Sequence, residues 1–124
     1  MPHFVLECSD NIVESIDPKE FFPALHELLI GAGPFNLQEI KSRVIRHQEY
    51  FIADGAPDKA FVHLTLSILQ GREIGLQKTV GKKVLEFLKE RFEASSQKRE
   101  LALSLEIREM SRETYFKETV RGTK

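Results

Sequence analysis

The amino-acid sequence predicts a small α+β fold built from two successive strand–helix–strand halves. Apolar and polar residues alternate at the start of each half, apolar residues recur at helical spacing in its middle, and strand-like residues return at its end. We expect one domain over residues 1–124, with halves of about 2–57 and 58–124, forming a four-stranded sheet packed on two helices. A chain of 124 residues, 41% of them hydrophobic, is an ordinary size for one core.

Two strands are expected in the first half. Phe4, Leu6 and Cys8 occupy every second position, which predicts a strand that begins almost at the N-terminus. Residues 40–51 interleave β-branched and aromatic residues with polar ones, and they predict a second strand that ends before the turn residues at 53–57.

A helix is expected between these two strands, over about residues 18–31. Asp17 is a helix-capping residue type, and Pro18 suits the first helical position. Apolar residues then recur at helical spacing. Gly31 and Gly33 supply the left-handed positions that commonly end a helix, so we expect the helix to stop there.

The second half repeats this order. Residues 61–69 alternate strictly and residues 101–107 alternate again, so both segments predict strands. Between them, apolar residues at helical spacing predict an amphipathic helix: Leu76, Val80, Val84, Phe87, Leu88 and Phe92. One face of the 61–69 strand carries Val62, Leu64, Leu66 and Ile68.

The same order of elements also describes the ferredoxin-like split βαβ fold, so periodicity leaves two fold families open. An RNA-recognition protein of that fold needs an aromatic strand motif. Residues 59–64 match this motif only in part, because its glycine and its final aromatic residue are absent.

Composition excludes several classes of partner. The formal net charge is -1 and the acids and bases are interspersed, so nothing resembles the basic surface of a nucleic-acid-binding protein. The single cysteine, Cys8, has no partner for an internal disulfide, and we expect it in the core. We expect no membrane insertion and a cytoplasmic location, since no charged segment followed by an apolar run opens the chain.

Longer runs of the sequence resemble the 5-carboxymethyl-2-hydroxymuconate isomerases. This family belongs to the tautomerase superfamily, whose other members include 4-oxalocrotonate tautomerase and macrophage migration inhibitory factor. The opening run, PHFVLECSDNI at 2–12, is the most specific. Further runs match in the same order along the chain: ADG at 53–55, FVHLTL at 61–66, GR at 71–72, LALSLEI at 101–107 and FK at 116–117.

The resemblance implies a fused pair of βαβ units, each equivalent to one subunit of the smaller 4-oxalocrotonate tautomerase-like proteins, assembled as a homotrimer. It implies a cofactor-independent isomerase that converts a hydroxymuconate dienol into its conjugated keto isomer, in homoprotocatechuate (4-hydroxyphenylacetate) catabolism. The expected partner is therefore a small anionic dienol, and no cofactor is expected. No metal is expected either, because the four histidines lack paired ligand spacing.

Pro2 is the candidate catalytic residue. Met1 is usually removed before a small second residue such as proline, which leaves Pro2 with a secondary amine. A proton-shifting enzyme needs a base with a pKa near the operating pH, and an α-amino group is already close, at about 7.7–8.0. Burial and neighbouring cations lower that value further. The resemblance marks Pro2 as the family's general base and acid.

Basic residues are the candidate substrate-binding groups, because cations hold carboxylates and stabilise a dienolate. The resemblance places Lys41 and Arg72 at positions where the family normally carries active-site arginines, so Lys41 is a departure that loses the planar fork of arginine. Arg43 lies two residues along the same strand, on the same face, and is expected to share this role. Arg46 is a further candidate on that strand.

Two other readings of the function remain open. The same amine serves decarboxylases and dehalogenases of the superfamily, and a non-catalytic oligomeric interaction module would retain the fold without needing the amine.

Apolar walls around the amine would exclude water and lower its pKa. The candidates for such walls, with ordinary core packing as the alternative, are Phe35, Phe51 and Phe116.

Overall fold

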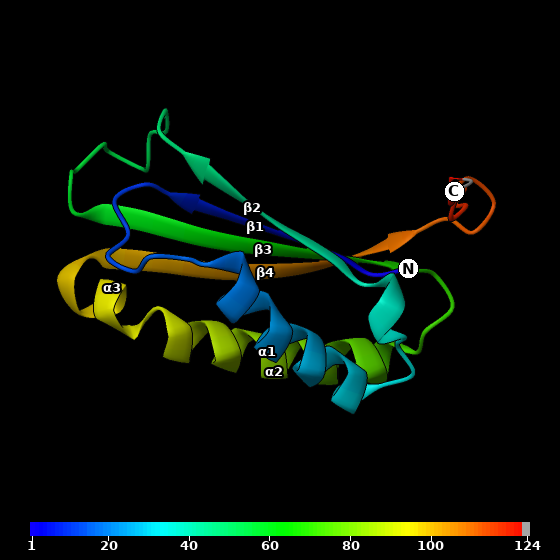
Figure 1. Ribbon diagram of the computed structural model, residues 1–124. Coiled ribbons are helices and arrows are strands. Elements are labelled where there is room, and N and C mark those ends of the chain that lie inside the picture. Colours follow the sequence, from blue (N-terminus) through cyan, green and yellow to red (C-terminus); the bar gives the residue numbers. More distant parts are fainter. Residues whose placement is uncertain (123–124) are drawn as a thin grey trace.

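The computed structural model describes residues 1–122 and contains one four-stranded sheet with its helices on a single face (Figure 1). The elements in chain order are β1 (His3–Ser9), α1 (Pro18–Ala32), the 3-10 helix η1 (Leu37–Glu39), β2 (Lys41–His47), β3 (Lys59–Leu69), α2 (Ile74–Arg91), α3 (Glu93–Lys98) and β4 (Glu100–Met110). The predicted α+β architecture of four strands and two long helices is confirmed, and α3 is an additional short helix.

The strand order decides between the two fold families. The sheet runs β2-β1-β3-β4, with β1 parallel to β2, β3 parallel to β4, and β1 antiparallel to β3. The two strands of each strand–helix–strand unit are therefore direct neighbours, whereas in the split βαβ fold another strand lies between them. The ferredoxin-like alternative is therefore wrong. The RNA-recognition interpretation required that fold, so it is wrong as well.

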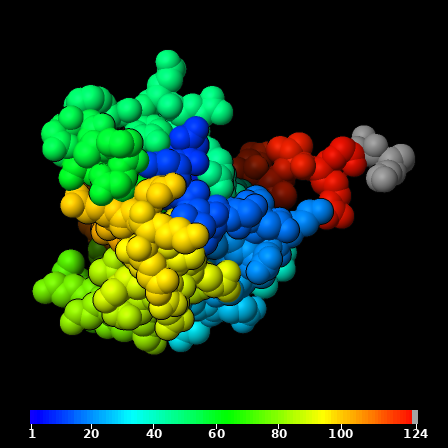
Figure 2. Space-filling view, turned by 90° about the vertical axis from the view of Figure 1, so that its left-hand side faces the viewer, coloured from blue at the N-terminus to red at the C-terminus, as the bar shows by residue number. Residues whose placement is uncertain are grey.

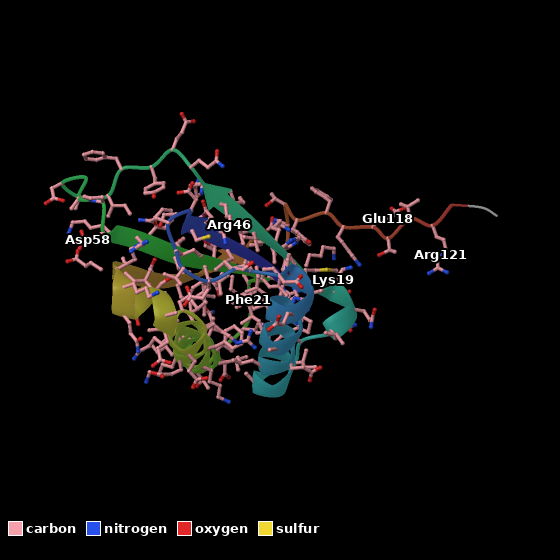
Figure 3. All side chains as sticks on the ribbon, turned by 60° about the vertical axis from the view of Figure 1, so that its left-hand side comes forward. Lys19, Phe21, Arg46, Asp58, Glu118 and Arg121 are labelled. Atoms are coloured by element: carbon pink, nitrogen blue, oxygen red, sulfur yellow. The ribbon has the colours of Figure 1, made fainter. Side chains whose placement is uncertain are left out.

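The hydrophobic core lies between the sheet and helices α1 and α2. Alternate residues of β1 and β3 point into it, including the predicted apolar face of β3, as period-two patterning requires. Phe21, labelled in Figure 3, packs edge-on against Phe22 and Phe87 and so links α1 to α2. Cys8 is fully buried, as expected, and burial raises the pKa of its thiol.

Helix α1 begins where the sequence predicts but ends differently. Asp17 accepts a hydrogen bond from the Lys19 N–H at 3.0 Å, which satisfies one of the free donors of the first turn. The helix runs through Gly31 to Ala32, and Gly33 follows with an extended φ of -172°. The expected left-handed termination at these glycines is wrong.

Strand β2 is shorter than the predicted segment 40–51. It pairs only with β1 among the described strands, and β1 ends at Ser9, which lies opposite His47. Residues beyond His47 have no strand to pair with, so Tyr50 and Phe51 belong to the loop before β3. Their aromatic character, which favours strands, produced the longer prediction.

The second face of the sheet is open within residues 1–122, because every helix lies on the other side (Figure 1). The N-terminus and the end of β4 lie at the same end of the sheet, so the segment after β4 passes near the start of the chain (Figure 1). Its last described residues project from the body of the molecule (Figure 2). None of the helices described is long and apolar enough to cross a membrane.

Candidate active site

The N-terminal amine is held at one end of the sheet by the first residues of β1. The Lys41 N–H donates to the Pro2 carbonyl at 3.1 Å, which extends the pairing of β1 with β2 by one residue. The Pro2 side chain is buried. The amine nitrogen of Met1 lies 3.5 Å from Glu39 Oε1. The start of the chain therefore has a defined position rather than a frayed one.

Three charged side chains surround this amine. Burial is the main cause that lowers the pKa of the amine, and the positive charges of Arg72 and Lys41 lower it further. Glu39 acts in the opposite direction, through its charge and its hydrogen bond, and raises it. The net pKa lies below the usual value of an α-amino group. Lys41 and Arg72 were predicted from separate parts of the sequence, and both lie near the N-terminal amine.

Arg72 is oriented by the turn between β3 and α2. Gly71 adopts φ +116°, a backbone conformation that L side chains rarely adopt, and this turn leads into Arg72. The guanidinium lies 4.7 Å from the centroid of the Phe35 ring, and Nη2 donates to the Pro34 carbonyl at 3.5 Å. Its Nε–H is buried and has no hydrogen-bond partner within residues 1–122.

Lys41 is held less firmly than Arg72. Its Nζ donates to the Glu39 carbonyl at 3.3 Å, and the side chain is otherwise exposed. In the sheet register Lys41 lies opposite His3, on the open face. The ammonium is therefore free to move toward an anion that approaches the amine.

Arg43 and Arg46 have different positions relative to the amine. Arg43 shares the open face with Lys41, and its Nη1 lies 3.4 Å from His3 Nδ1, one residue beyond Pro2. Arg46 lies on the helix side of β2, where Nη2 donates to the Glu14 carbonyl at 3.1 Å (Figure 3). The structure places Arg43 at the margin of the cluster and Arg46 outside it.

The sequence prediction missed the charged and polar groups that complete the cluster. Lys117 Nζ lies 3.7 Å from Glu39 Oε2, so the C-terminal segment reaches the same carboxylate as the amine. Tyr115 Oη lies 2.9 Å from His3 Nε2. Burial, followed by the charges of Arg43 and Lys41, lowers the pKa of His3. The FK run at 116–117 was the one sequence signal for this segment.

The three predicted aromatic walls do not behave alike. Phe35 is partly buried and supports Arg72, as described above. Phe51 and Phe116 are 79% and 89% exposed, so within a single chain neither packs in the core nor encloses the amine. The expectation for these two is wrong for the isolated chain, because both lie on loop segments outside the sheet and helices.

Another hollow of the surface lies away from the amine. It is an open groove of about 600 Å³ between α2 and the edge strand β4, and apolar side chains dominate its lining. Ile74, Leu85, Leu103 and Leu105 contribute to it together with two lysines of α2. The charged side chains that line it are these two lysines, whereas the amine cluster brings an amine, a carboxylate and two further cations together. The amine cluster is therefore the better candidate for chemistry.

A partly buried amine beside cations has a defined chemical capacity. Its lowered pKa makes the unprotonated form, which accepts a proton, more accessible than in an ordinary α-amino group. The neighbouring cations favour a carboxylate ligand and the negative charge of an enolate. Together these groups suit the movement of a proton within an anionic substrate.

Comparisons with known proteins agree with this chemistry. The family model described as 5-carboxymethyl-2-hydroxymuconate isomerase matches residues 2–121. The chain is 41% identical over 118 residues to the 5-carboxymethyl-2-hydroxymuconate Delta-isomerase of Escherichia coli, covering 95% of this chain and 94% of that protein.

Solved structures show the same relationship. The crystal structure of a 5-carboxymethyl-2-hydroxymuconate isomerase from Deinococcus radiodurans R1 superimposes with a TM-score of 0.88 at 35% identity, covering 96% of this chain and 90% of that chain. A fused 4-OT symmetric trimer shares the fold, with a TM-score of 0.69 at 9% identity over 89% and 86% of the two chains. The chain belongs to the 5-carboxymethyl-2-hydroxymuconate isomerase family.

Proposed function

We propose that the chain, after removal of Met1, is a cofactor-independent isomerase of 5-carboxymethyl-2-hydroxymuconate or a similar hydroxymuconate polycarboxylate, acting in the cytoplasm in the catabolism of aromatic compounds. The observation that carries the proposal is the partly buried N-terminal amine, which lies among Lys41, Arg72 and Glu39. Membership of the isomerase family supports the same reaction.

In this proposal the Pro2 amine acts first as base and then as acid. It takes the proton from the enol hydroxyl, which leaves a dienolate, and it returns that proton to a carbon at the other end of the conjugated system. No atom is gained or lost, and no electron acceptor is needed. Lys41 and Arg72 stabilise the dienolate, since its negative charge develops beside them.

The cations near the amine also favour a substrate that carries several carboxylates. A carboxymethyl-substituted muconate carries several carboxylates, and Lys41, Arg43 and Arg72 offer positive charge along one margin of the sheet. The buried Nε–H of Arg72, which has no partner among residues 1–122, would gain one if a carboxylate binds the guanidinium side-on.

We further propose that three copies assemble. The sheet has open edges at β2 and β4, its outer face carries no helix, and Ile74, Phe116 and Val120 are 66%, 89% and 81% exposed. A ring of three chains would cover edges and apolar side chains that a monomer leaves in water. The fused 4-OT trimer, which has the same fold, supports such an assembly.

The test is a direct assay of the processed protein. Chelator-treated protein, shown by mass spectrometry to lack Met1, is mixed with 5-carboxymethyl-2-hydroxymuconate and the ultraviolet spectrum is followed. Conversion of dienol to conjugated ketone without added cofactor is expected. Release of carbon dioxide or halide from related substrates, with no ketonisation, would identify the decarboxylase or dehalogenase alternative, and the absence of any turnover would favour an interaction module.

A further inference from the structure

Glu39 is the charged residue at the amine for which neither the resemblance nor the chemistry above has a role. It lies at the end of η1, two residues before Lys41, and its side chain is 31% exposed. The 3-10 turn that carries it is capped at its N-terminal end by Asn36, whose side chain accepts a hydrogen bond from the Gln38 N–H at 3.0 Å. The Glu39 backbone is therefore fixed next to the start of β2.

The two oxygens of Glu39 face two different cations. Oε1 lies 3.5 Å from the N-terminal nitrogen, and Oε2 lies 3.7 Å from Nζ of Lys117. The Glu39 side chain is 31% exposed, so its carboxylate is more protected from solvent than that of Glu100, which is 70% exposed in its pair with Lys59. The carboxylate thus joins the N-terminus to the C-terminal segment.

A second contact fixes the same segment on the open face of the sheet. Tyr115 Oη lies 2.9 Å from His3 Nε2, and the two rings meet edge to face with their centroids 6.0 Å apart. Residues beyond Lys117 leave the body, as the labelled Glu118 and Arg121 show in Figure 3. Within residues 1–122, Tyr115 and Lys117 thus connect this segment to His3 and Glu39 beside the start of the chain.

We propose that Glu39 is a positioning residue of the isomerase reaction: one carboxylate oxygen orients the N-terminal amine, and the other holds Lys117 beside it as an additional cation for the substrate. This inference rests on the proposed function, in which the amine is that of Pro2. Loss of Met1 moves the amine by one residue, about 3.8 Å along the chain, which is within reach of a flexible glutamate side chain.

The charges around the amine predict in which direction its pKa changes when Glu39 or Lys117 is replaced. The groups facing it are Glu39 from η1, Lys41 from β2, Arg72 from the turn after β3, and His3 from β1, while Lys117 faces Glu39 from the C-terminal segment. Glu39 is the group in this set that favours the protonated form of the Met1 amine, and we expect the same sign at the Pro2 amine that replaces it. Removing its charge therefore lowers the pKa of the amine, and removing Lys117 raises it by leaving Glu39 unopposed.

The experiment titrates the amine directly, by nuclear magnetic resonance of processed protein with isotope-labelled proline. Glu39→Gln is expected to lower the pKa of the Pro2 amine by at least about half a pH unit, the size expected for one elementary charge about 4 Å away in a water-like medium. Lys117→Met is expected to raise it, and to do so less in the Glu39→Gln background, because the two residues act as a pair. Glu100→Gln, which removes a carboxylate from a lysine pair at the far end of the sheet, is the matched control and leaves it unchanged.

Kinetics separate this role from a structural one. For Glu39→Gln the acidic limb of the kcat/KM profile is expected to move to lower pH, and the plateau kcat to fall by about tenfold, because the amine is a weaker and less well oriented base. An unchanged amine pKa in Glu39→Gln would overturn the inference. If processed wild-type protein fails to ketonise the dienol at all, the proposed function fails instead, and the titration of the amine still tests the contact with Glu39.

Discussion

Lys41 and Arg72 carry the same charge but are held differently beside the amine. Arg72 is braced by the Phe35 ring and the Pro34 carbonyl, whereas Lys41 contacts one backbone carbonyl and otherwise faces solvent. A planar, braced guanidinium binds a carboxylate with two hydrogen bonds and loses little side-chain entropy. We therefore infer that Arg72 contributes more to substrate binding than Lys41.

Replacing these cations tests that ranking. Arg72→Ala and Lys41→Ala should each lower kcat/KM for the tricarboxylate, by about 10- to 100-fold, since a hydrogen bond to a charged group contributes about 1.5–3 kcal/mol. The loss should be larger for Arg72→Ala, and smaller for both variants with a monocarboxylate 2-hydroxydienoate. Arg46→Ala, on the helix side of β2, is the control. Equal losses for the two substrate types would show that these residues do not bind the additional carboxylates.

The amine predicts the pH dependence of the processed protein. The base works when unprotonated. Burial, with the charges of Arg72 and Lys41, lowers the pKa of the Met1 amine, and we expect the same direction at Pro2 once Met1 is removed. Activity therefore persists to lower pH than an ordinary amine allows, and the acidic limb of kcat/KM should have its midpoint below about 7.7–8.0. Steady-state rates measured from acidic to mildly alkaline pH provide the check, and a midpoint at or above the ordinary value would contradict this electrostatic account.

The residues of the site were predictable to different degrees. Pro2, Lys41 and Arg72 were predicted because the sequence runs around them resemble a known family, and their role stays a prediction. Glu39 and Lys117 were not found, because they meet across 78 positions of the chain and sit in a 3-10 turn and an irregular segment that periodicity does not describe. Spacing along a sequence reports neighbours on one helix or strand, and it carries no information on such contacts.

The turn between β3 and α2 is the element on which the position of Arg72 depends. Gly71→Ala forces an L side chain into φ +116° and should cost about 1–3 kcal/mol of stability, because that backbone conformation is strained without glycine. We expect the KM for the tricarboxylate to rise as Arg72 shifts. Gly75→Ala is the matched control, because its added methyl group meets nothing within 4 Å and alanine favours helix α2. Urea unfolding and steady-state kinetics test both variants, and equal behaviour of the two would contradict this role of the turn.

Whole elements were predicted well where a pattern was long, and poorly at their ends. The alternation in β3 and the helical spacing in α2 located both elements, since burial of one face imposes these periods. The end of β2 depends on where β1 stops, and the end of α1 on the backbone conformation of Gly33. Neither end is encoded in the local pattern. The predicted second strand therefore ran past His47, and the predicted left-handed end of the first helix was wrong.

The assembly is the prediction that concerns the whole molecule. Sedimentation at micromolar concentration should give three times the mass of the chain, because the open sheet face and both sheet edges remain uncovered in one copy. Ile45→Asp, at a residue of β2 that is 43% exposed, should shift the protein toward monomer by placing a charge in the interface. Val13→Asp, at 41% exposure outside the sheet, is the control and should remain trimeric. A wild-type monomer would contradict the proposed ring.

The proposed reaction depends on the free amine of Pro2, and controlled removal of Met1 tests this dependence. Protein that retains Met1, verified by mass spectrometry, is treated with methionine aminopeptidase, and the rate of dienol ketonisation is followed together with the fraction processed. Almost no activity is expected at the start, because the Pro2 nitrogen is then an amide without useful basicity, and the rate should rise in proportion to the processed fraction. If protein that keeps Met1 ketonises the dienol as fast as processed protein, Pro2 is not the base.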